Sequence, residues 1–273
     1  ESVPFNDKKD GVPQAKKLHF DFETFDADTI REFAHKLEIK TSTFFDSVFG
    51  FVLSKFSGAE ESLFATVFNG RYEKLKRTCG MFVKTMPLYC NIQKTDDIEQ
   101  YLKEIDLQID NSRKHNLYSY SDICSDFQIS PQVLFSYQGD VLNKISFCGS
   151  ETVAEFESSN DPKEIITFEI YRNNGKFYAE LEYITDLFNE ESMQILLCSY
   201  EKAISEFLRK LKLSEVEITD SNQISLLDSF NATEDEYEKT DIVTLFRQQA
   251  KQNPDNTAVV YLDKSYNYKE TDE

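Results

Sequence analysis

Between Thr41 and Gly58 the sequence places large apolar residues around most of the circumference of a helix. Such a helix is stable in water only when other layers of structure bury it on several sides. Ser57-Gly58 is a typical helix end, and Thr41 or Ser42 is expected to cap the start. The apolar positions are Phe44, Phe45, Val48, Phe49, Val52, Leu53 and Phe56. This segment therefore predicts a layered fold built around one buried helix.

The rest of the first 213 residues alternates between strand and helix patterns. Asn173-Asn174-Gly175 predicts a hairpin turn, because Asn and Gly tolerate positive φ. The expected strands are residues 18–22, 63–68, 132–138, 164–171 and 176–183. Further helices are expected after Asp26, after Thr95-Asp96-Asp97 and after Asn189, the last with an apolar stripe reaching Leu211. This mixture indicates a layered α/β or α+β fold.

The character of the sequence changes after residue 213. Residues 214–240 are polar and acidic, which is typical of a linker. A helix is expected from Asp241 to Asn253-Pro254, followed by a strand at 257–262 and the start of another at 266–268. We therefore divide the chain into residues 1–213, a linker at 214–240 and a second segment at 241–273.

Charge and cysteine usage exclude several classes of function. A net charge of −19 repels nucleic acid and anionic membrane surfaces, and no apolar run is long enough to span a bilayer. Five widely spaced cysteines favour free thiols in a cytoplasmic protein over disulfides or a metal site. No catalytic triad, phosphate-binding loop or metal-ligand spacing is recognisable, so no catalytic, metal-binding or cofactor-binding residue is assigned.

Four stretches, in order, resemble the condensation domains of non-ribosomal peptide synthetases. The most specific is Cys79–Leu88, which is similar to the family's Gly-x-Phe-Val-Asn-Thr-x-Pro-Leu segment, with Lys84 in place of Asn. The family also has a Gly-Arg pair after a strand, a Phe-Asn-Tyr-Gln strand and a Tyr-Asn-x-x-Leu-Phe junction. The matching stretches are Asn69-Gly70-Arg71, Leu134–Gln138 and Leu181–Phe188.

The end of the chain carries a second resemblance. Ser229–Thr233, Leu245-Phe246, Pro254-Asp255 and Tyr266–Glu270 are similar to the start of an adenylation domain. Its opening motif normally reads Leu-Thr-Tyr-x-Glu-Leu, from which Tyr266, Asn267 and Thr271 depart. Residues 241–273 are therefore expected to be the N-terminal fragment of an adenylation domain.

The first resemblance implies a fold similar to chloramphenicol acetyltransferase, with this chain as the C-terminal lobe of the condensation domain. The parent enzyme would form peptide bonds between thioester substrates held on phosphopantetheine arms of carrier proteins. The implied partners are the N-terminal lobe, peptidyl and aminoacyl carrier proteins and the adenylation domain; no cofactor would bind this chain directly. The residues implied to line the substrate tunnel are Asn69, Gly70, Arg71, Gly80, Phe82, Val83, Thr85, Tyr137 and Gln138.

The family's catalytic signature, His-His-x-x-x-Asp-Gly, is absent, since no two of the three histidines are adjacent. The isolated chain is therefore expected to be inactive. Two alternative functions stay open: a stand-alone acyltransferase using coenzyme A, and a non-catalytic module that docks carrier proteins.

Several residues also allow a structural interpretation. Arg71 could clamp carbonyls of its own loop, and Gly80 could serve a turn alone. Phe82, Val83, Tyr137 and Gln138 could belong to the core or to a strand ladder. His115 is expected at the surface or at a helix cap. The basic run of Arg71, Lys74, Lys76 and Arg77 could meet an acidic carrier protein or remain a solvated loop.

Overall fold

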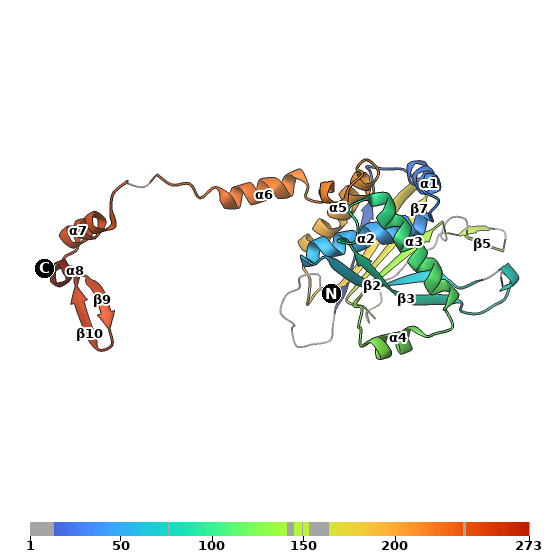
Figure 1. The fold of residues 1–273 in the computed structure, drawn as a ribbon, viewed down its shortest axis with the longest axis horizontal. Helices are drawn as coiled ribbons and strands as arrows, with labels where there is room; N and C mark the ends of the chain where they lie inside the picture. The colour runs from blue at the N-terminus through green and yellow to red at the C-terminus, as the bar shows by residue number, and fades with distance from the viewer. Residues whose placement is uncertain are drawn as a thin grey trace. The chain divides into compact units, whose positions relative to one another are not determined.

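The computed structural model describes residues 14–71, 73–75, 77–140, 145–148, 150–152, 164–236 and 239–272. The chain divides into two compact units, Glu1–Gln223 and Ile224–Glu273. Both units are drawn in Figure 1.

The first unit contains a six-stranded mixed sheet in the order β1-β8-β7-β4-β2-β3. Strands β2, β4 and β7 run parallel to one another, and the other neighbours pair antiparallel. The strands are β1 (Ala15–Asp21), β2 (Glu61–Asn69), β3 (Val83–Asn91), β4 (Val133–Gly139), β7 (Ile166–Asn173) and β8 (Lys176–Ile184), with a separate small hairpin of β5 (Ile145–Phe147) and β6 (Ser150–Thr152). The predicted mixed α/β fold is confirmed.

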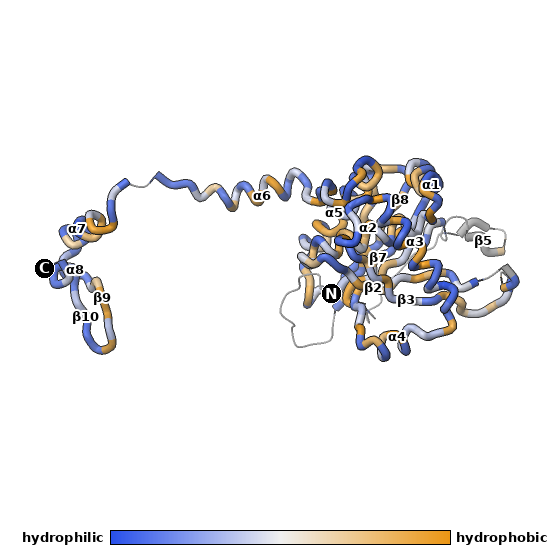
Figure 2. Tube along the Cα trace, viewed as in Figure 1, coloured by the Kyte–Doolittle hydropathy of each residue, from blue (hydrophilic) through white to orange (hydrophobic). Residues whose placement is uncertain are grey.

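Helices pack against this sheet and carry most of the core. They are α1 (Ala27–Lys36), α2 (Thr41–Ser57), α3 (Ile98–Lys114), α4 (Tyr120–Phe127) and α5 (Glu190–Phe207), with single 3₁₀ turns at η1 (Glu73–Leu75) and η2 (Leu213–Glu215). Helix α2 contacts α1, α3, α5 and three strands, as its apolar circumference predicted. Hydrophobic stretches of the strands lie beside these helices (Figure 2).

Aromatic rings fill the space between α2 and the sheet. The ring of Phe49 stacks on Phe135 of β4 at 4.6 Å and contacts Phe168 of β7 at 5.1 Å. Tyr200 of α5 closes the cluster from the other side, and its hydroxyl donates to the Phe45 carbonyl at 3.0 Å. All four rings are fully buried. Such interlocked rings contribute packing energy beyond the area that they bury.

Two local sequence predictions were wrong. Neither Thr41 nor Ser42 caps α2; the N-cap is Lys40, whose side chain makes no cap bond. Asp106 of α3 binds the start of this helix, accepting from the Lys40 N–H at 3.4 Å and from the Thr43 hydroxyl at 2.5 Å. Helix α5 ends at Phe207, and Leu211 is exposed rather than part of the apolar stripe.

The hairpin between β7 and β8 forms where the sequence predicted it. Asn174 has φ 49° and Gly175 has φ 81°, so both central residues of the turn are left-handed. That geometry matches the twist of the two strands and fixes their register. As a result Phe168 faces Leu181 and Glu169 faces Glu180 across the pair.

The second unit is built from α7 (Ile242–Gln252), a hairpin of β9 (Thr257–Tyr261) and β10 (Lys264–Asn267), and the short helix α8 (Tyr268–Asp272). Asp241 caps α7, since its side chain accepts from the Thr244 N–H at 2.9 Å. The rings of Phe246 and Tyr268 lie 5.5 Å apart and join α7 to α8.

Residues 214–240, which the sequence predicts to be a linker, contain a helix. Helix α6 (Ser221–Asn231) lies there, and the division between the two units falls inside it, after Gln223. Several of its apolar side chains are exposed: Ile224, Leu226, Leu227 and Phe230. No helix among the described residues is long and apolar enough to cross a membrane.

Candidate functional site

Arg71 holds the loop that follows β2 in a fixed shape. Its guanidinium donates to the carbonyls of Leu75 at 3.1 Å, Thr78 at 2.6 Å and Gly80 at 2.9 Å. It also lies over the ring of Phe82, 4.5 Å from the ring centre. A planar guanidinium offers enough donors for three carbonyls and a flat face for one ring. The interpretation of Arg71 as a carbonyl clamp is therefore confirmed.

Two glycines allow this loop to return to the sheet. The Gly70 N–H donates to the Phe82 carbonyl at 3.0 Å, and a Cβ at Gly70 would lie 2.2 Å from that oxygen. Gly80 has φ 151°, a conformation that L side chains rarely adopt. Asn69 completes the turn by accepting from the Arg71 N–H at 3.0 Å. These residues therefore set where β3 begins.

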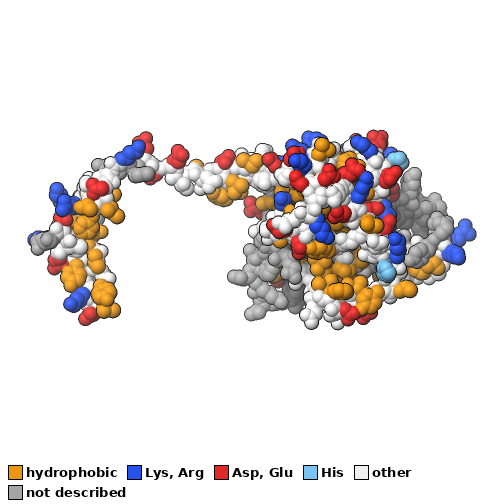
Figure 3. All heavy atoms as spheres, in the orientation of Figure 1, with side chains coloured by type: hydrophobic (Ala, Val, Ile, Leu, Met, Phe, Trp, Pro, Cys, Tyr) orange, Lys and Arg blue, Asp and Glu red, His pale blue; other side chains and the backbone are white. Residues whose placement is uncertain are grey.

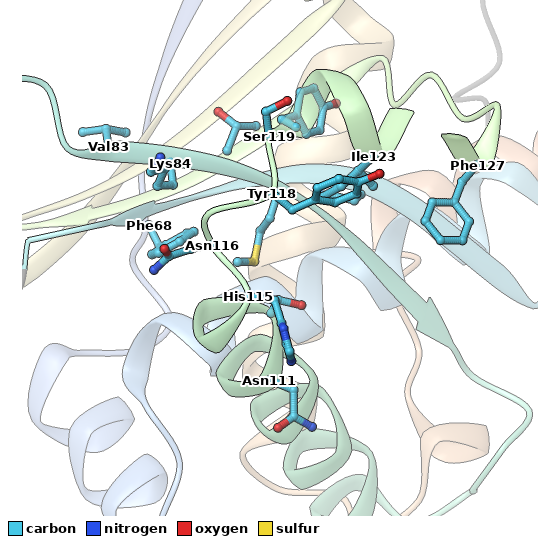
Figure 4. Close-up of a pocket in the computed structure, with 15 residues that line it drawn as sticks. Phe68, Val83, Lys84, Asn111, His115, Asn116, Tyr118, Ser119, Ile123 and Phe127 are labelled. Atoms are coloured by element: carbon cyan, nitrogen blue, oxygen red, sulfur yellow. The ribbon is translucent and has the colours of Figure 1, made fainter. Parts of the chain in front are cut away.

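Val83 and Thr85 lie on β3 and line a pocket of about 580 Å³ (Figure 4). In that view Val83 and Lys84 lie near one end, Phe127 of α4 lies near the other, and His115 and Asn111 come from the end of α3. The floor is largely apolar and includes Phe68, Met86, Pro87 and Ile123, and hydroxyl groups of Thr85, Tyr118, Ser119 and Tyr120 lie on its walls.

Tyr137 and Gln138 point to opposite faces of the sheet, because successive residues of a strand alternate. The Tyr137 ring stacks on Phe45 of α2 at 5.1 Å, and burial raises the pKa of its hydroxyl. Gln138 faces away from α2 and donates to the Ser136 hydroxyl and to the Glu169 carboxylate, both at 3.0 Å. Only Gln138 of this pair therefore reaches the sheet face opposite the helices.

That opposite face carries a row of polar side chains across four strands. Glu169 of β7 also accepts from the Tyr171 hydroxyl at 3.1 Å, and the Tyr171 ring stacks on Tyr178 of β8 at 5.3 Å. Further along, Nδ1 of His19 on β1 lies 2.7 Å from Oε1 of Glu180. Burial, together with Glu169, raises the pKa of Tyr171 far above its usual value. We call Ser136, Gln138, Glu169, Tyr171, Tyr178, Glu180 and His19 the polar row.

The sequence analysis missed both the polar row and α4. Alternation within β7 could have placed Glu169 and Tyr171 on one face, but the parallel pairing of β4 with β7 leaves no local signal. For α4, the cap was readable: the Ser119 hydroxyl accepts from the Asp122 N–H at 3.1 Å. His115 is the C-cap of α3 and is exposed, which confirms its expected surface or capping role.

The predicted tunnel residues thus fall into three places. Arg71, Asn69, Gly70, Gly80 and Phe82 shape one loop, Val83 and Thr85 line the pocket, and Tyr137 and Gln138 lie on β4. Of the basic run, Lys74 and Arg77 are exposed, and Lys76 lies outside the described residues. Among the described residues, no group of three or more His, Cys, Asp or Glu side chains could hold a metal ion.

The family is identified by a match to the condensation-domain model over residues 4–227. This chain therefore belongs to the condensation-domain family of non-ribosomal peptide synthetases. It is 24% identical to bacitracin synthase 2 of Bacillus licheniformis over 81% of its own length and 9% of that protein. It is 25% identical to bacitracin synthase 1 of the same organism, over 90% of this chain and 5% of the relative. The chain thus spans a tenth or less of these relatives.

Solved structures support the fold. A four-domain non-ribosomal peptide synthetase bound to AMP and glycine matches 98% of this chain with a TM-score of 0.73 and 20% identity, over 22% of its own length. The epimerization domain from the third module of tyrocidine synthetase B matches 76% of this chain with a TM-score of 0.59 and 14% identity, over 51% of its own length.

Proposed function

We propose that this chain is the C-terminal lobe of a condensation domain, and that the parent enzyme joins two carrier-bound substrates by a peptide bond. One observation carries the proposal: separate condensation-type domains are matched over about half their length. The epimerization domain is covered to 51%, and a condensation domain of the monacolin K polyketide synthase MokA to 54%, with a TM-score of 0.61 and 14% identity. A chain that supplies one lobe of a two-lobed domain would cover about half the length of such a domain.

In the proposed reaction an amine held on one phosphopantetheine arm attacks the thioester carbon held on the other. The new amide bond forms as the carbon–sulfur bond breaks, and the amine loses a proton while the thiol leaves. The base would come from the adjacent histidines of the other lobe, because this chain contains no such pair. We infer that this lobe binds and orients substrate and is inactive alone.

Two features support a tunnel wall on this lobe. The polar row places hydrogen-bonding groups at fixed positions on the sheet face opposite the helices. Gln138 donates to Glu169 there at 3.0 Å. The clamp at Arg71 fixes the start of β3, and with it Val83 and Thr85 in the pocket. We therefore assign Gln138, Val83 and Thr85 direct contact with substrate. Asn69, Gly70, Arg71, Gly80 and Phe82 would position them, and the Tyr137 ring would support β4 from the core.

We further propose that residues 241–273 begin an adenylation domain, with residues 214–240 as the connection. The match to the four-domain synthetase supports this assignment, because it covers 98% of the chain, whereas the family model ends at residue 227. The order of α7, the β9–β10 hairpin and α8 also agrees with the motif positions in the sequence. The proposed partners are the N-terminal lobe, carrier proteins and the remaining adenylation domain.

A condensation assay with loaded donor and acceptor carriers tests the proposal. The 273-residue chain alone should give no dipeptide above background, and the same chain preceded by a lobe carrying the paired histidines should give product. In that longer protein Gln138→Ala should lower kcat by roughly tenfold, about 1.4 kcal/mol of lost transition-state stabilisation. The exposed Leu211→Ala is the matched control and should leave kcat unchanged. Turnover by the chain alone would refute the proposal.

A docking module is the second candidate, because the X-domain of teicoplanin biosynthesis matches 80% of this chain with a TM-score of 0.66 and 13% identity. That domain was also solved in complex with OxyB. If the longer protein binds carriers but yields no product with paired histidines in place, docking is favoured. If it acylates an amine from acyl coenzyme A without carriers, the stand-alone acyltransferase is favoured instead.

A further inference from the structure

Strand β3 is one edge of the six-stranded sheet, and half of that edge is closed. Gln108 of α3 takes both backbone groups of Tyr89: its Oε1 accepts from the Tyr89 N–H at 3.2 Å, and its Nε2 donates to the Tyr89 carbonyl at 2.9 Å. Pro87 has no N–H to offer. A side-chain amide that imitates a neighbouring strand, and a proline, are both means of blocking an exposed edge.

The other half of the edge is open. The Tyr89 backbone groups point away from β2, and the β2–β3 register runs without a bulge to Val83. Backbone direction repeats every two residues, so the N–H and C=O groups of Thr85 and Val83 also point outward. The Phe82 carbonyl points the other way, toward Gly70, as this alternation requires. No residue that the structure describes hydrogen-bonds the outward groups of Val83 and Thr85.

Apolar side chains border this open edge and extend beyond it. The pocket along β3 includes Phe68, Met86 and Ile123. Phe127, at one end of the pocket, is 71% exposed, and Met81, which precedes β3 and does not line the pocket, is 91% exposed. Hydrophobic side chains gather over this part of the surface (Figure 3). Large exposed apolar residues around a groove are typical of a protein interaction site.

Charged groups of both signs border the groove, since Asp126 accepts from Tyr118 and Asp122 accepts from Ser119, both of which line it. Lys84 and His115 line it, and the Arg113 guanidinium lies 5.4 Å from the ring centre of the lining residue Phe68. The whole chain has a net charge of −19. Lys84, on the β3 side of the groove, therefore favours a ligand with a negative charge opposite it.

We propose that the Val83–Thr85 edge binds an extended segment of a partner protein, which adds one strand to the sheet beside β3. Val83 and Thr85 are two positions apart, and each offers one backbone donor and one backbone acceptor. This spacing matches the repeat of hydrogen-bonding groups along an extended peptide strand. The exposed apolar residues at one end of the pocket and outside it, Phe127 and Met81, favour an occupant longer than a small substrate. The segment is apolar at alternate positions and carries an acidic residue opposite Lys84. This interaction goes beyond the proposed function, because it uses the outward backbone groups of Val83 and Thr85, whereas the substrate contacts assigned to them use their side chains.

The test uses the full 273-residue chain and a blocked peptide, acetyl-Glu-Val-Thr-Val-Thr-Val-amide, in a calorimetric titration and in amide hydrogen exchange. In the free chain, the Val83 and Thr85 amides should exchange faster than those of Lys84 and Met86. We expect the peptide to bind and to slow exchange at the Val83 and Thr85 amides. Methylating the peptide nitrogens that face β3 should weaken binding at least tenfold, whereas methylating the alternate set should not. Equal loss with both methylated peptides, or no binding, would overturn the proposal.

A pair of variants makes the same test from the protein side. Thr85→Pro removes the outward N–H of the edge, a change that edge strands tolerate. Thr85→Val keeps the N–H and a similar shape. Far-ultraviolet circular dichroism establishes that both variants fold. Thr85→Pro should weaken peptide binding at least tenfold relative to Thr85→Val, and equal affinities would refute backbone recognition. Self-association of the wild-type chain that Thr85→Pro abolishes would assign the edge to a second copy and overturn the proposed partner.

Discussion

The two faces of the six-stranded sheet differ in the contacts that they make, although the same strands form both. On the face toward α2 and α5, β4 contributes Phe135, which is fully buried among rings. On the opposite face the next residues along β4 are Ser136 and Gln138, joined to each other and to Glu169. Alternation along one strand thus separates packing from hydrogen bonding. We conclude that the helix face fixes the fold and that the opposite face is free to carry specificity.

The largest effect should follow truncation on the helix face. Phe135→Ala removes a ring that contacts Phe49 at 4.6 Å, Phe168 at 5.8 Å and Phe64 at 6.2 Å. Because neighbouring rings cannot all close the cavity, we expect a loss of about 3–5 kcal/mol in the free energy of unfolding. Urea denaturation of the first unit, followed by tyrosine fluorescence, measures it.

Gln138→Ala on the opposite face is the matched comparison. It removes one hydrogen-bonding side chain at a half-buried position, so the expected loss is about 1 kcal/mol. If Gln138→Ala destabilised the chain as much as Phe135→Ala, the division of labour between the two faces would be wrong.

A pH-dependent effect should come from the buried carboxyl on the helix face. Asp46 of α2 accepts from the Thr66 hydroxyl at 2.6 Å, and burial raises the pKa of Asp46 from 3.8 to about 7. A raised folded-state pKa gives stability that is complete below pH 3.8 and is lost as pH rises through about 7. At about 1.4 kcal/mol per pKa unit, we expect ionisation of Asp46 to lower the free energy of unfolding by about 4 kcal/mol across this window.

Asp46→Asn should abolish this pH-dependent loss, which unfolding titrations from pH 4 to pH 8 would measure. Thr66→Val is the informative control. The Thr66 hydrogen bond lowers the pKa of Asp46, so its removal should move the transition to higher pH and leave the slope in place. If the free energy of unfolding changed equally between pH 4 and pH 7 in the wild-type chain and in the Asp46→Asn variant, the assignment would be wrong.

The sequence predicted the helix face well and the opposite face poorly. Helical spacing in residues 41–57 identified the buried helix, and Asn173-Asn174-Gly175 identified the hairpin whose register the structure shows. Both signals are local, since a few neighbouring residues decide them. The clamp at Arg71 was among the interpretations for the same reason, because every carbonyl that it binds lies within nine residues.

The features that the sequence did not predict depend on contacts between distant segments. Asp106 of α3 binds the start of α2, 66 residues away in sequence, and Gln108 binds the backbone groups of Tyr89 on β3, 19 residues away. The polar row needs β4 beside β7 and β8 beside β1, and no local pattern specifies either pairing. Residue types alone therefore could not gather the candidate site.

The smallest effect should come from the exposed end of the polar row. Hydrogen bonding to Glu180 is the main cause that raises the pKa of His19, and Asp21, 3.3 Å from Nε2, adds to it. Lys17 lies 3.5 Å from Glu180 on the same face, and the Tyr178 ring lies 5.2 Å from that of His19. The raised pKa gives stability that is present below pH 6.5 and is lost as pH rises through the folded-state pKa.

Glu180→Gln should therefore lower the pKa of His19, measured from the pH dependence of its ring proton shifts by nuclear magnetic resonance. Asp21→Asn should lower it less, because the hydrogen bond to Glu180 is the larger cause. The change in unfolding free energy should stay below about 1 kcal/mol, since solvent screens a pair in which His19 is 54% exposed. A cost comparable to that of Phe135→Ala would mean that the opposite face helps to fix the fold, because an ion pair open to water cannot supply so much.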